Sequence, residues 1–305
     1  TGGIFEVNIP LEGKWSTVYT NGQIPSVTLD LQEGYNLLDV SDNVKEASAY
    51  RSVNLIHDHM REWLTNFTAL DISLTTNIDV EGECNAFFDG GSINFFDTGG
   101  GCNPTSLIAD VVYHEYGHAI NGYFYNTLGS GFNNGAMNEG YADFWAMSLG
   151  DIAEIGKGFY EENNDGIRKY DSDPKVYPDN LVGEVHADGE IIAGAWYDTH
   201  LLMGGDWDAT LALFVDAYPG LQATAPNGNE GQAFTDVLLD VEHMTGFLIE
   251  RSSKRMKQVC QQILKEKGFN ITVDQWDVLQ ELNKNDGQGQ IALANRTYRD
   301  APTIT

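Results

Sequence analysis

The chain has 305 residues, of which 45 are Asp or Glu and 17 are Lys or Arg, so its formal net charge at pH 7 is −28. A surface of this sign repels nucleic acids and anionic membranes, which argues against either as a partner. Hydrophobic residues make up 42% and aromatic residues 11% of the sequence, as in ordinary globular proteins, so wholesale disorder is excluded.

The length is typical of about two domains or of one domain with two lobes. No run approaches the roughly 18 apolar residues that a membrane-spanning helix needs, so we expect no membrane span. The sequence opens with Thr-Gly-Gly, without the basic and apolar segments of a signal peptide. We therefore expect a mature or trimmed form, from which any targeting signal has been removed.

The first hundred residues carry mostly strand patterns. Alternating runs such as Val27–Leu31 predict strands. Apolar residues then recur near a 3.6-residue spacing from Val44 to Phe67, which predicts a long amphipathic helix. Alternation over Leu70–Leu74 predicts a half-buried strand. Two aromatic-rich runs, Cys84–Phe88 and Ser92–Phe96, flank a Gly-containing turn and predict a hairpin.

The rest of the chain carries mostly helical patterns. Apolar periodicity predicts helices over Thr105–Tyr125, Met137–Leu149 and Ile191–Met203. Apolar faces predict further helices around Leu211–Val215, Phe234–Val241, Met256–Leu264 and Val273–Leu282. We therefore expect an α+β fold, with a β-rich lobe over residues 1–125 and a mostly helical lobe over residues 126–305. A cleft is expected over the helix that ends the first lobe.

That helix contains His114-Glu115-Tyr116-Gly117-His118, an H-E-x-x-H sequence. Residues four apart lie on one helix face, so His114 and His118 can bind one ion, and zinc accepts neutral imidazole nitrogen. Glu115 lies too far round the helix to be a convenient ligand but can take a proton from a water that the metal activates. Two histidines on a solvated helix face are the alternative, because the motif also arises by chance.

A third ligand is predicted at the start of the next helix. Glu139 follows His118 by 21 residues, a span that can return it to the histidine pair. Two histidines and one glutamate leave one position open, which is the arrangement of catalytic rather than structural zinc. Asp143, one turn beyond Glu139, can accept the outer N–H of a ligand histidine, and we place Asn138 in the same surrounding shell. An ordinary acidic helix face is the alternative.

These two motifs together resemble the gluzincin zinc metallopeptidases, specifically the thermolysin and fungalysin families. The segment Cys84–Gly90 resembles the family strand that precedes the zinc helix and binds the substrate backbone. Val185–Ile191 resembles the V-H-x-x-G-E stretch of fungalysins, so the resemblance is closer to the fungalysin side. The resemblance is specific over about residues 45–205 and loose in the later helical region.

The resemblance implies a thermolysin-like, two-lobed metallopeptidase fold with one catalytic zinc ion on His114, His118 and Glu139. It implies that Glu115 is the general base and that His186 stabilises the transition state. Taken alone, His186 is more often an ordinary surface or core histidine. The zinc ion, the base and the transition-state histidine would together hydrolyse internal peptide bonds.

Substrate contacts are implied in the same way. An extended peptide would lie along Asn85 and Ala86 by strand addition, and Arg168 sits where the family carries an arginine that contacts a substrate carbonyl. Val111 and Ile167 would help to wall an apolar pocket, so we expect cleavage before bulky hydrophobic residues. From the residues alone, Asn85 could merely end a turn and Arg168 could form a structural ion pair.

The sequence departs from the family pattern at two positions. The family's oxyanion tyrosine would fall near Ser130, where none is present. The acid that orients the transition-state histidine would fall at Leu181, while Asp179 and Glu184 lie on either side. The sequence therefore leaves open which acid, if any, orients that histidine.

Two structural features stay as expectations. The family's paired-calcium pattern is partly present, which predicts a structural calcium ion near Asp110, Asp151 and Glu154. Cys84 and Cys102 bracket the predicted hairpin and could form a disulfide in an exported protein. The third cysteine, Cys260, lies in a helical pattern and is expected to be a buried apolar side chain.

The sequence thus predicts a secreted zinc-dependent endopeptidase that acts on proteins or peptides and that an inhibitory pro-segment could hold inactive. One alternative is an exopeptidase-like gluzincin, but no G-x-M-E-N-like signature is present. The other is a catalytically inactive module that acts in protein binding. Glu115 argues against the inactive module, because a residue that is not a ligand has no structural role at a zinc site.

Overall fold

A computed structural model describes residues 5–131, 134–221 and 267–284, together with residues 237, 261, 264–265, 290 and 292–293. The chain divides into two compact units, Thr1–Val241 and Glu242–Thr305. In the second unit, α7 (Val273–Lys284) matches the helix predicted there. Cys260 and nearly all of two other predicted helices lie outside the described residues. The predicted lobe boundary at residues 125 and 126 falls inside the first unit and stays a prediction.

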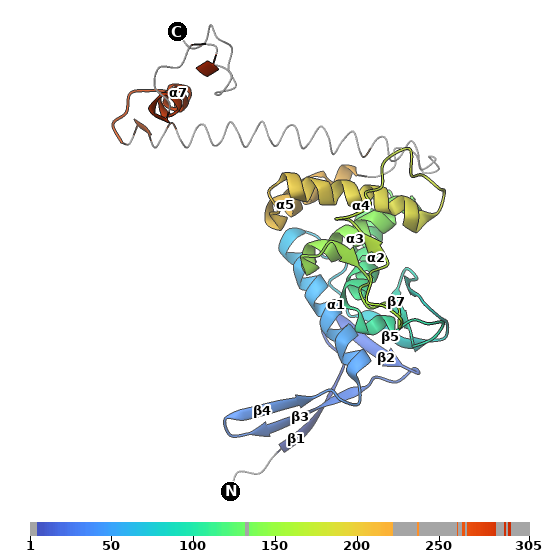
Figure 1. The fold of residues 1–305 in the computed structure, drawn as a ribbon. Coiled ribbons are helices and arrows are strands. Elements are labelled where there is room, and N and C mark those ends of the chain that lie inside the picture. The colour runs from blue at the N-terminus through green and yellow to red at the C-terminus, as the bar shows by residue number, and fades with distance from the viewer. Residues whose placement is uncertain are drawn as a thin grey trace. The chain divides into compact units, whose positions relative to one another are not determined.

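The strands of the first unit form two main sheets (Figure 1). One sheet is antiparallel, in the order β1 (Phe5–Pro10), β3 (Ser26–Gln32), β4 (Tyr35–Asp39). The other has the order β2 (Ser16–Thr20), β5 (Leu74–Val80), β7 (Ser92–Phe96), β6 (Ala86–Phe88). β2, β5 and β7 are parallel, whereas β6 runs antiparallel to β7. β6 is therefore an edge strand, and the predicted hairpin is confirmed.

The crossover from β2 to its parallel partner β5 contains β3, β4 and helix α1 (Val44–Trp63), and parallel pairing requires such a crossover. The buried apolar face of α1 consists of Ala49, Val53, Ile56 and Met60. Burial of each of the larger side chains contributes about 1.5–3 kcal/mol. This face packs on β2 and β5 and on the zinc-motif helix, which lies alongside α1 (Figure 1).

The prediction of a strand over Leu70–Leu74 is wrong, because β5 begins at Leu74. Residues 70–73 form turns, in which the Asp71 N–H donates to the Thr68 carbonyl and the Ile72 N–H donates to the Leu70 carbonyl. The apolar residues of this stretch do not share one buried face as those of a strand would, because Leu70 is buried while Ile72 is exposed.

The remaining elements of the first unit are mostly helical. They are η1 (Thr105–Leu107), α2 (Ala109–Thr127), α3 (Gly135–Gly150), the two-stranded ribbon of β8 (Glu154–Ile155) and β9 (Arg168–Lys169), α4 (Val185–Leu202), α5 (Trp207–Ala217) and η2 (Tyr218–Gly220). Fully buried aromatic side chains from the last four helical elements form a common core: Phe144, Trp145, Trp196, Phe214 and Tyr218. None of the described helices is long and apolar enough to cross a membrane.

Two glycines allow α2, α3 and α4 to approach one another closely. A Cβ atom on Gly117 would lie 2.7 Å from Ala142 Cα, so α2 touches the backbone of α3 there. A Cβ atom on Gly189 would lie 2.7 Å from Glu139 Cβ and 2.9 Å from the Ala136 carbonyl oxygen, so α4 is equally close to α3. Real Cβ atoms do not come this near without a shift of the helices. Side chains of these three helices can therefore meet at one point.

Candidate active site

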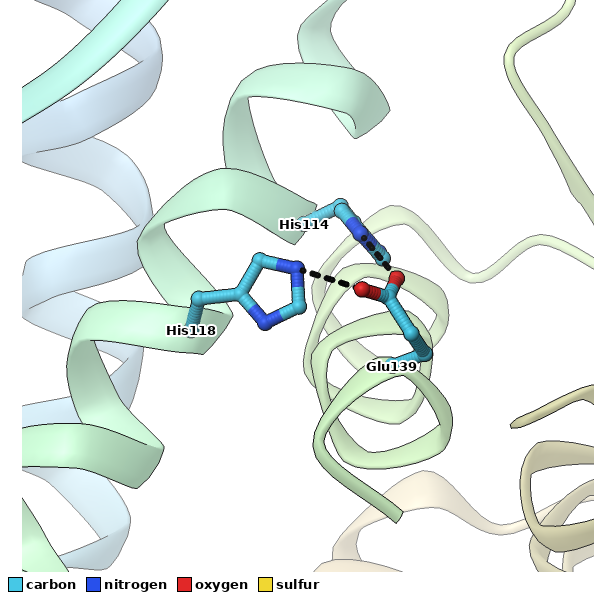
Figure 2. Close-up of side chains that lie close together, drawn as sticks. All are labelled: His114, His118 and Glu139. Atoms are coloured by element: carbon cyan, nitrogen blue, oxygen red, sulfur yellow. Dashed lines mark ion pairs between the residues drawn. The ribbon is translucent and has the colours of Figure 1, made fainter. Parts of the chain in front are cut away.

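Side chains of α2 and α3 converge where these two helices are in contact. His114 Nε2 lies 3.1 Å from Glu139 Oε2, and His118 Nε2 lies 3.5 Å from Glu139 Oε1 (Figure 2). The two imidazoles come from successive turns of α2 and converge on the carboxylate at the start of α3. Among the described residues, these three alone form a group of metal-type side chains whose ligand atoms lie within 4.8 Å of one another.

The donor set suits zinc, which binds imidazole nitrogen and carboxylate oxygen. His118 Nδ1 and Glu139 Oε2 are buried and lack a hydrogen-bond partner among the described residues. Burial raises the pKa of Glu139, but the two imidazoles that lie close to its carboxylate outweigh this effect, and the pKa lies far below its usual value. The carboxylate is therefore ionised and can serve as a ligand.

Glu115 lies beside the cluster without belonging to it. Its side chain lines the same pocket as His114 and His118, and it is 5% exposed. Oε2 has no hydrogen-bond partner in the described part of the chain. Burial raises the pKa of Glu115, and the neighbouring histidines oppose this rise. A buried carboxylate with a raised pKa is suited to exchange a proton.

Asp143, one turn along α3 from Glu139, binds three side chains. Oδ1 accepts a hydrogen bond from His114 Nδ1 at 2.5 Å. Arg168 forms a two-pronged pair with both carboxylate oxygens, at 2.5 and 2.6 Å, and the Tyr170 hydroxyl also donates to Oδ2. Burial lowers the pKa of His114, but Asp143 and Glu139 more than offset it and raise the pKa to about 10. Asp143 thus fixes the ring of a predicted ligand, as the sequence suggested for this position.

Asn138 lies next to the cluster but contacts a different residue. Its Oδ1 accepts a hydrogen bond from Asn121 Nδ2 at 2.7 Å, and its backbone carbonyl accepts another from the same amide at 3.1 Å. Asn138 therefore joins α3 to α2 one turn beyond His118, whose Nδ1 it does not reach.

His186 stands in the first turn of α4, because that helix begins at Val185 rather than near Ile191 as the apolar pattern predicted. Its Nε2 lies 3.6 Å from Glu139 Oε1, and its side chain is 54% exposed. Its Nδ1 lies 2.7 Å from Glu184 Oε1. Glu184 also accepts hydrogen bonds from two backbone N–H groups at the start of α4. The question that the sequence left open therefore has an answer: Glu184 is the acid that contacts His186.

Asn121 and Tyr170 are the contacts that sequence reasoning missed, whereas Glu184 was one of the two acids between which it could not choose. The spacing of Glu184 and His186 carried one usable signal, an acidic residue just before a helix start. Tyr170 follows the short strand β9, and Asn121 lies one turn beyond His118. Neither position carries a pattern that indicates its partner, because each depends on how distant segments pack.

A pocket of about 490 Å³ opens beside the cluster. Its lining contains all three predicted ligands, Glu115, Asn138 and His186, the predicted substrate residues Asn85, Ala86 and Arg168, and the predicted wall residues Val111 and Ile167. Ile155 and Phe159 extend the apolar wall. Asp143 holds the guanidinium of Arg168, which lines the same pocket.

No tyrosine occupies the position where the family carries its oxyanion donor. Tyr125 and Tyr141 point into the helical core, where each hydroxyl donates to the Leu221 carbonyl. Tyr160 is the tyrosine among the residues that line the pocket, and its side chain is partly exposed.

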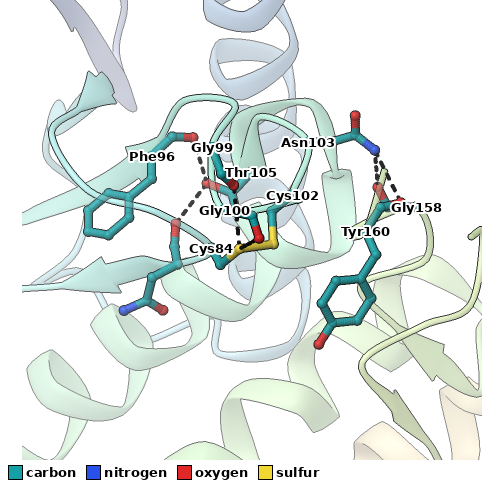
Figure 3. Close-up of a disulfide and its surroundings, with 10 residues drawn as sticks. Cys84, Phe96, Gly99, Gly100, Cys102, Asn103, Thr105, Gly158 and Tyr160 are labelled. Atoms are coloured by element: carbon teal, nitrogen blue, oxygen red, sulfur yellow. Dashed lines mark hydrogen bonds between the residues drawn. A yellow bond between two sulfur atoms is a disulfide. The ribbon is translucent and has the colours of Figure 1, made fainter. Parts of the chain in front are cut away.

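The cysteines and the acidic trio have different outcomes. Cys84 and Cys102 form a disulfide, with an S–S distance of 2.09 Å, beside the pocket (Figure 3). Asp110, Asp151 and Glu154 are all described but do not form a metal-type group. Each is instead bound to a protein donor.

Each of these three acids accepts a hydrogen bond from a different donor of the protein. Asp110 Oδ2 accepts from the Gly156 N–H at 3.0 Å, and Asp151 Oδ1 accepts from Trp207 Nε1 at 2.8 Å. Glu154 Oε1 accepts from the Gly166 N–H at 2.6 Å. Two lysines complete the surroundings of this last carboxylate: Lys157 and Lys169. The predicted calcium ligands are thus not brought together.

No protein-family model matches the chain, and no curated protein matches it. Among solved structures, the chain is similar to the precursor of protealysin, a metalloproteinase from Serratia proteamaculans. The TM-score is 0.53 and the sequence identity 18%, over 80% of this chain and 86% of that one. This likeness is one of fold, and it gives no support to the predicted closeness to the fungalysin side. The chain therefore has the predicted α+β, thermolysin-like fold.

Proposed function

We propose that this protein is a zinc-dependent endopeptidase. The observation that carries the proposal is the convergence of His114, His118 and Glu139 beside a buried carboxylate, Glu115, that is not one of the three. Zinc, when bound to these three residues, would supply a Lewis acid for the scissile carbonyl and lower the pKa of a water. The fold that the chain shares with a metalloproteinase precursor supports the same reaction class.

Each remaining residue has a task that its contacts suit. Glu115 takes a proton from the attacking water and delivers it to the leaving amine. Hydrogen bonds from His186 and from the Ala187 N–H lower the pKa of Glu184, so its ionised carboxylate can hold the His186 ring through Nδ1. His186 Nε2, which points toward the cluster, can then donate to the oxyanion that develops on the substrate.

The substrate would be an extended peptide. In the described part of the chain β6 pairs with β7 on one side only, so its other edge can accept a peptide by strand addition along Asn85 and Ala86. Val111, Ile155 and Ile167 line the adjoining part of the pocket. We therefore expect cleavage before bulky hydrophobic residues, and a peptide library in which charged residues are preferred there would contradict this specificity.

The disulfide supports export to an oxidising compartment, since disulfides persist there and are rare in the cytosol. The neighbour described as a precursor supports control by a pro-segment that occupies the groove until it is removed. Exopeptidase action and simple protein binding are the alternatives. Neither is favoured, because Glu115 has no role in binding and the groove is lined along the open edge of a strand.

Cleavage of a quenched-fluorescence peptide by the wild type and by Glu115→Gln, both loaded with one zinc per chain, tests the proposal. We expect turnover by the wild type and a loss of at least about a thousandfold in the variant, because proton transfer and water orientation are both removed. Equal melting temperatures would show that the variant is intact. No turnover by either protein, despite bound zinc, would contradict the endopeptidase and favour the binding module.

A further inference from the structure

The disulfide lies at the end of the strand along which a peptide would bind. Cys84 lines the pocket and directly precedes Asn85 and Ala86. The strand that follows, β6, has three residues and, among the described strands, pairs with β7 alone. So short an edge strand is weakly held by its own ladder, and its position depends on what fixes its ends.

Cys84 adopts a backbone conformation that needs support. Its φ is +53°, in the left-handed region that residues with a Cβ atom rarely adopt. Such a conformation persists only where surrounding contacts impose it. The covalent bond to Cys102, whose side chain is 1% exposed, anchors Cys84 to the protein interior. The disulfide therefore fixes the backbone at the point where β6 begins.

The loop that carries the second cysteine, residues 99–103, is also bonded to another segment that lines the pocket (Figure 3). The Asn103 N–H donates to the Phe159 carbonyl at 2.9 Å. Asn103 Nδ2 donates to the Gly158 carbonyl at 2.9 Å and to the Tyr160 carbonyl at 3.4 Å. Phe159 and Tyr160 line the pocket. This one loop is therefore attached to the start of β6 by the disulfide and to the Phe159–Tyr160 segment by hydrogen bonds.

We propose that the Cys84–Cys102 disulfide is a positioning element of the substrate groove, which holds the β6 edge and the Phe159–Tyr160 segment at a fixed separation before a peptide binds. The inference rests on the proposed peptidase function. Without the covalent bond, the peptide itself must order both segments, and this cost lowers its affinity. The metal cluster does not depend on the bond, because its three residues are placed by α2 and α3.

The test is the double variant Cys84→Ser with Cys102→Ser, so that no lone thiol from this pair remains to react with Cys260. With zinc loaded and its stoichiometry measured, we expect KM for a quenched-fluorescence peptide to rise about fivefold to tenfold, the cost of ordering one or two segments. kcat should stay within about twofold, because the reacting groups are unchanged. Wild type reduced with a phosphine should behave in the same way, whereas thiol reductants also bind zinc.

A second measurement is independent of catalysis. The dissociation constant of a dye-labelled peptide, measured by fluorescence anisotropy on the Glu115→Gln background, should rise by the same factor when both cysteines are replaced. Asn103→Ala keeps the disulfide but loosens the loop from Gly158 and Tyr160, so a smaller rise in KM is expected. This variant tests the same role if the cysteine-free protein does not fold.

Asp206→Ala is the matched control. Asp206 caps α5 by accepting from the Ala209 N–H at 3.1 Å and does not line the pocket, so its loss lowers stability without affecting the groove. An equal rise in KM for this variant, or an unchanged KM and dissociation constant in the folded cysteine-free protein, would overturn the positioning role. No turnover by wild type would contradict the peptidase instead, while peptide affinity would still test the disulfide.

Discussion

The predicted zinc ligands and the acidic residues around Asp110 lie in the same part of the chain, yet their side chains are held differently. His114, His118 and Glu139 project from two helices that touch at Gly117, and their ligand atoms converge. Asp110 lies in the first turn of α2, whereas the other two acids of its group lie at the end of α3 and in β8. Each of those three carboxylates is bound to a nearby donor of the protein.

The difference shows what a metal site needs. Many acidic residues in one region are not enough, because an exposed carboxylate readily satisfies itself with a lysine or a backbone N–H group. Ligand atoms converge where rigid elements are packed closely and where a neighbouring group, here Asp143, fixes the orientation of a ligand ring.

Replacement of Asp143 should cause the largest effect. In Asp143→Ala, Arg168 stays buried without its partner and His114 loses the acceptor of its Nδ1 hydrogen bond. Loss of one member of a buried pair costs about 3–5 kcal/mol of unfolding free energy. Loss of the ring's partner lowers metal affinity by about tenfold to a hundredfold. Urea denaturation and competition with a zinc indicator measure the two effects.

The double variant Asp143→Ala with Arg168→Met is the control for that experiment. It removes both charges, so much of the lost stability should return while zinc affinity stays low. Wild-type zinc affinity in the single variant would contradict the role given to Asp143.

The parts of the site that lie on single helices could be predicted from the sequence. Helical periodicity places residues 114 and 118 on one face regardless of the rest of the fold. The position of Glu139 and the role of Asp143 follow from the same spacing rule on the next helix. The hairpin from Cys84 to Phe96 was equally accessible, since its turn chemistry is local.

Contacts made through loops were not accessible in this way. Glu184 meets His186 because α4 begins at Val185, earlier than its apolar pattern indicates. Tyr170 reaches Asp143 only after the chain has returned through the β8–β9 ribbon. The position of the acidic trio depends on the path of the same ribbon. Spacing rules carry no information about such returns, so the calcium ligands and the partner of His186 could not be settled from the sequence.

pH should change the stability of the metal-free protein in a direction set by His114. Its pKa in the folded protein is about 10, against an ordinary value of 6.5. The folded state therefore binds more protons than the unfolded state between these values, and stability falls as pH rises through this window. The loss should be about 1.5–3 kcal/mol, the net contribution of a charge-assisted hydrogen bond. Urea denaturation after zinc removal, from pH 6 to pH 10, measures it.

In Asp143→Asn the histidine loses the charge that raises its pKa, so the decline over this pH window should be much shallower than in wild type. Equal slopes in the two proteins would mean that another group accounts for the decline. With zinc bound the decline should also weaken, because a ligand imidazole must be neutral.

Gly117→Ala tests the contact between the two helices of the cluster. The added Cβ would lie 2.7 Å from Ala142 Cα, so the helices must separate, at a cost of about 1–3 kcal/mol. Zinc affinity should fall as well, because Glu139 moves with α3. Gly122→Ala is the matched control on the same helix, since its Cβ would meet Phe88 at an ordinary 3.7 Å. That change should leave zinc binding intact, and similar zinc affinities in both variants would contradict the close-approach argument.

Calcium should have the smallest effect. A calcium ion held by Asp110, Asp151 and Glu154 would bind the folded state alone and raise the melting temperature by several degrees at a hundred times its dissociation constant, a linkage of about 2.7 kcal/mol. The present contacts oppose such a site, because the three carboxylates are held apart by separate donors and Lys169 lies 3.2 Å from Glu154. We therefore expect millimolar calcium, added to zinc-loaded protein, to leave the melting temperature unchanged. A clear rise in melting temperature that Glu154→Gln abolishes would contradict this expectation. It would show that the three carboxylates come together only when the calcium ion binds, unlike the zinc ligands, which converge without a metal.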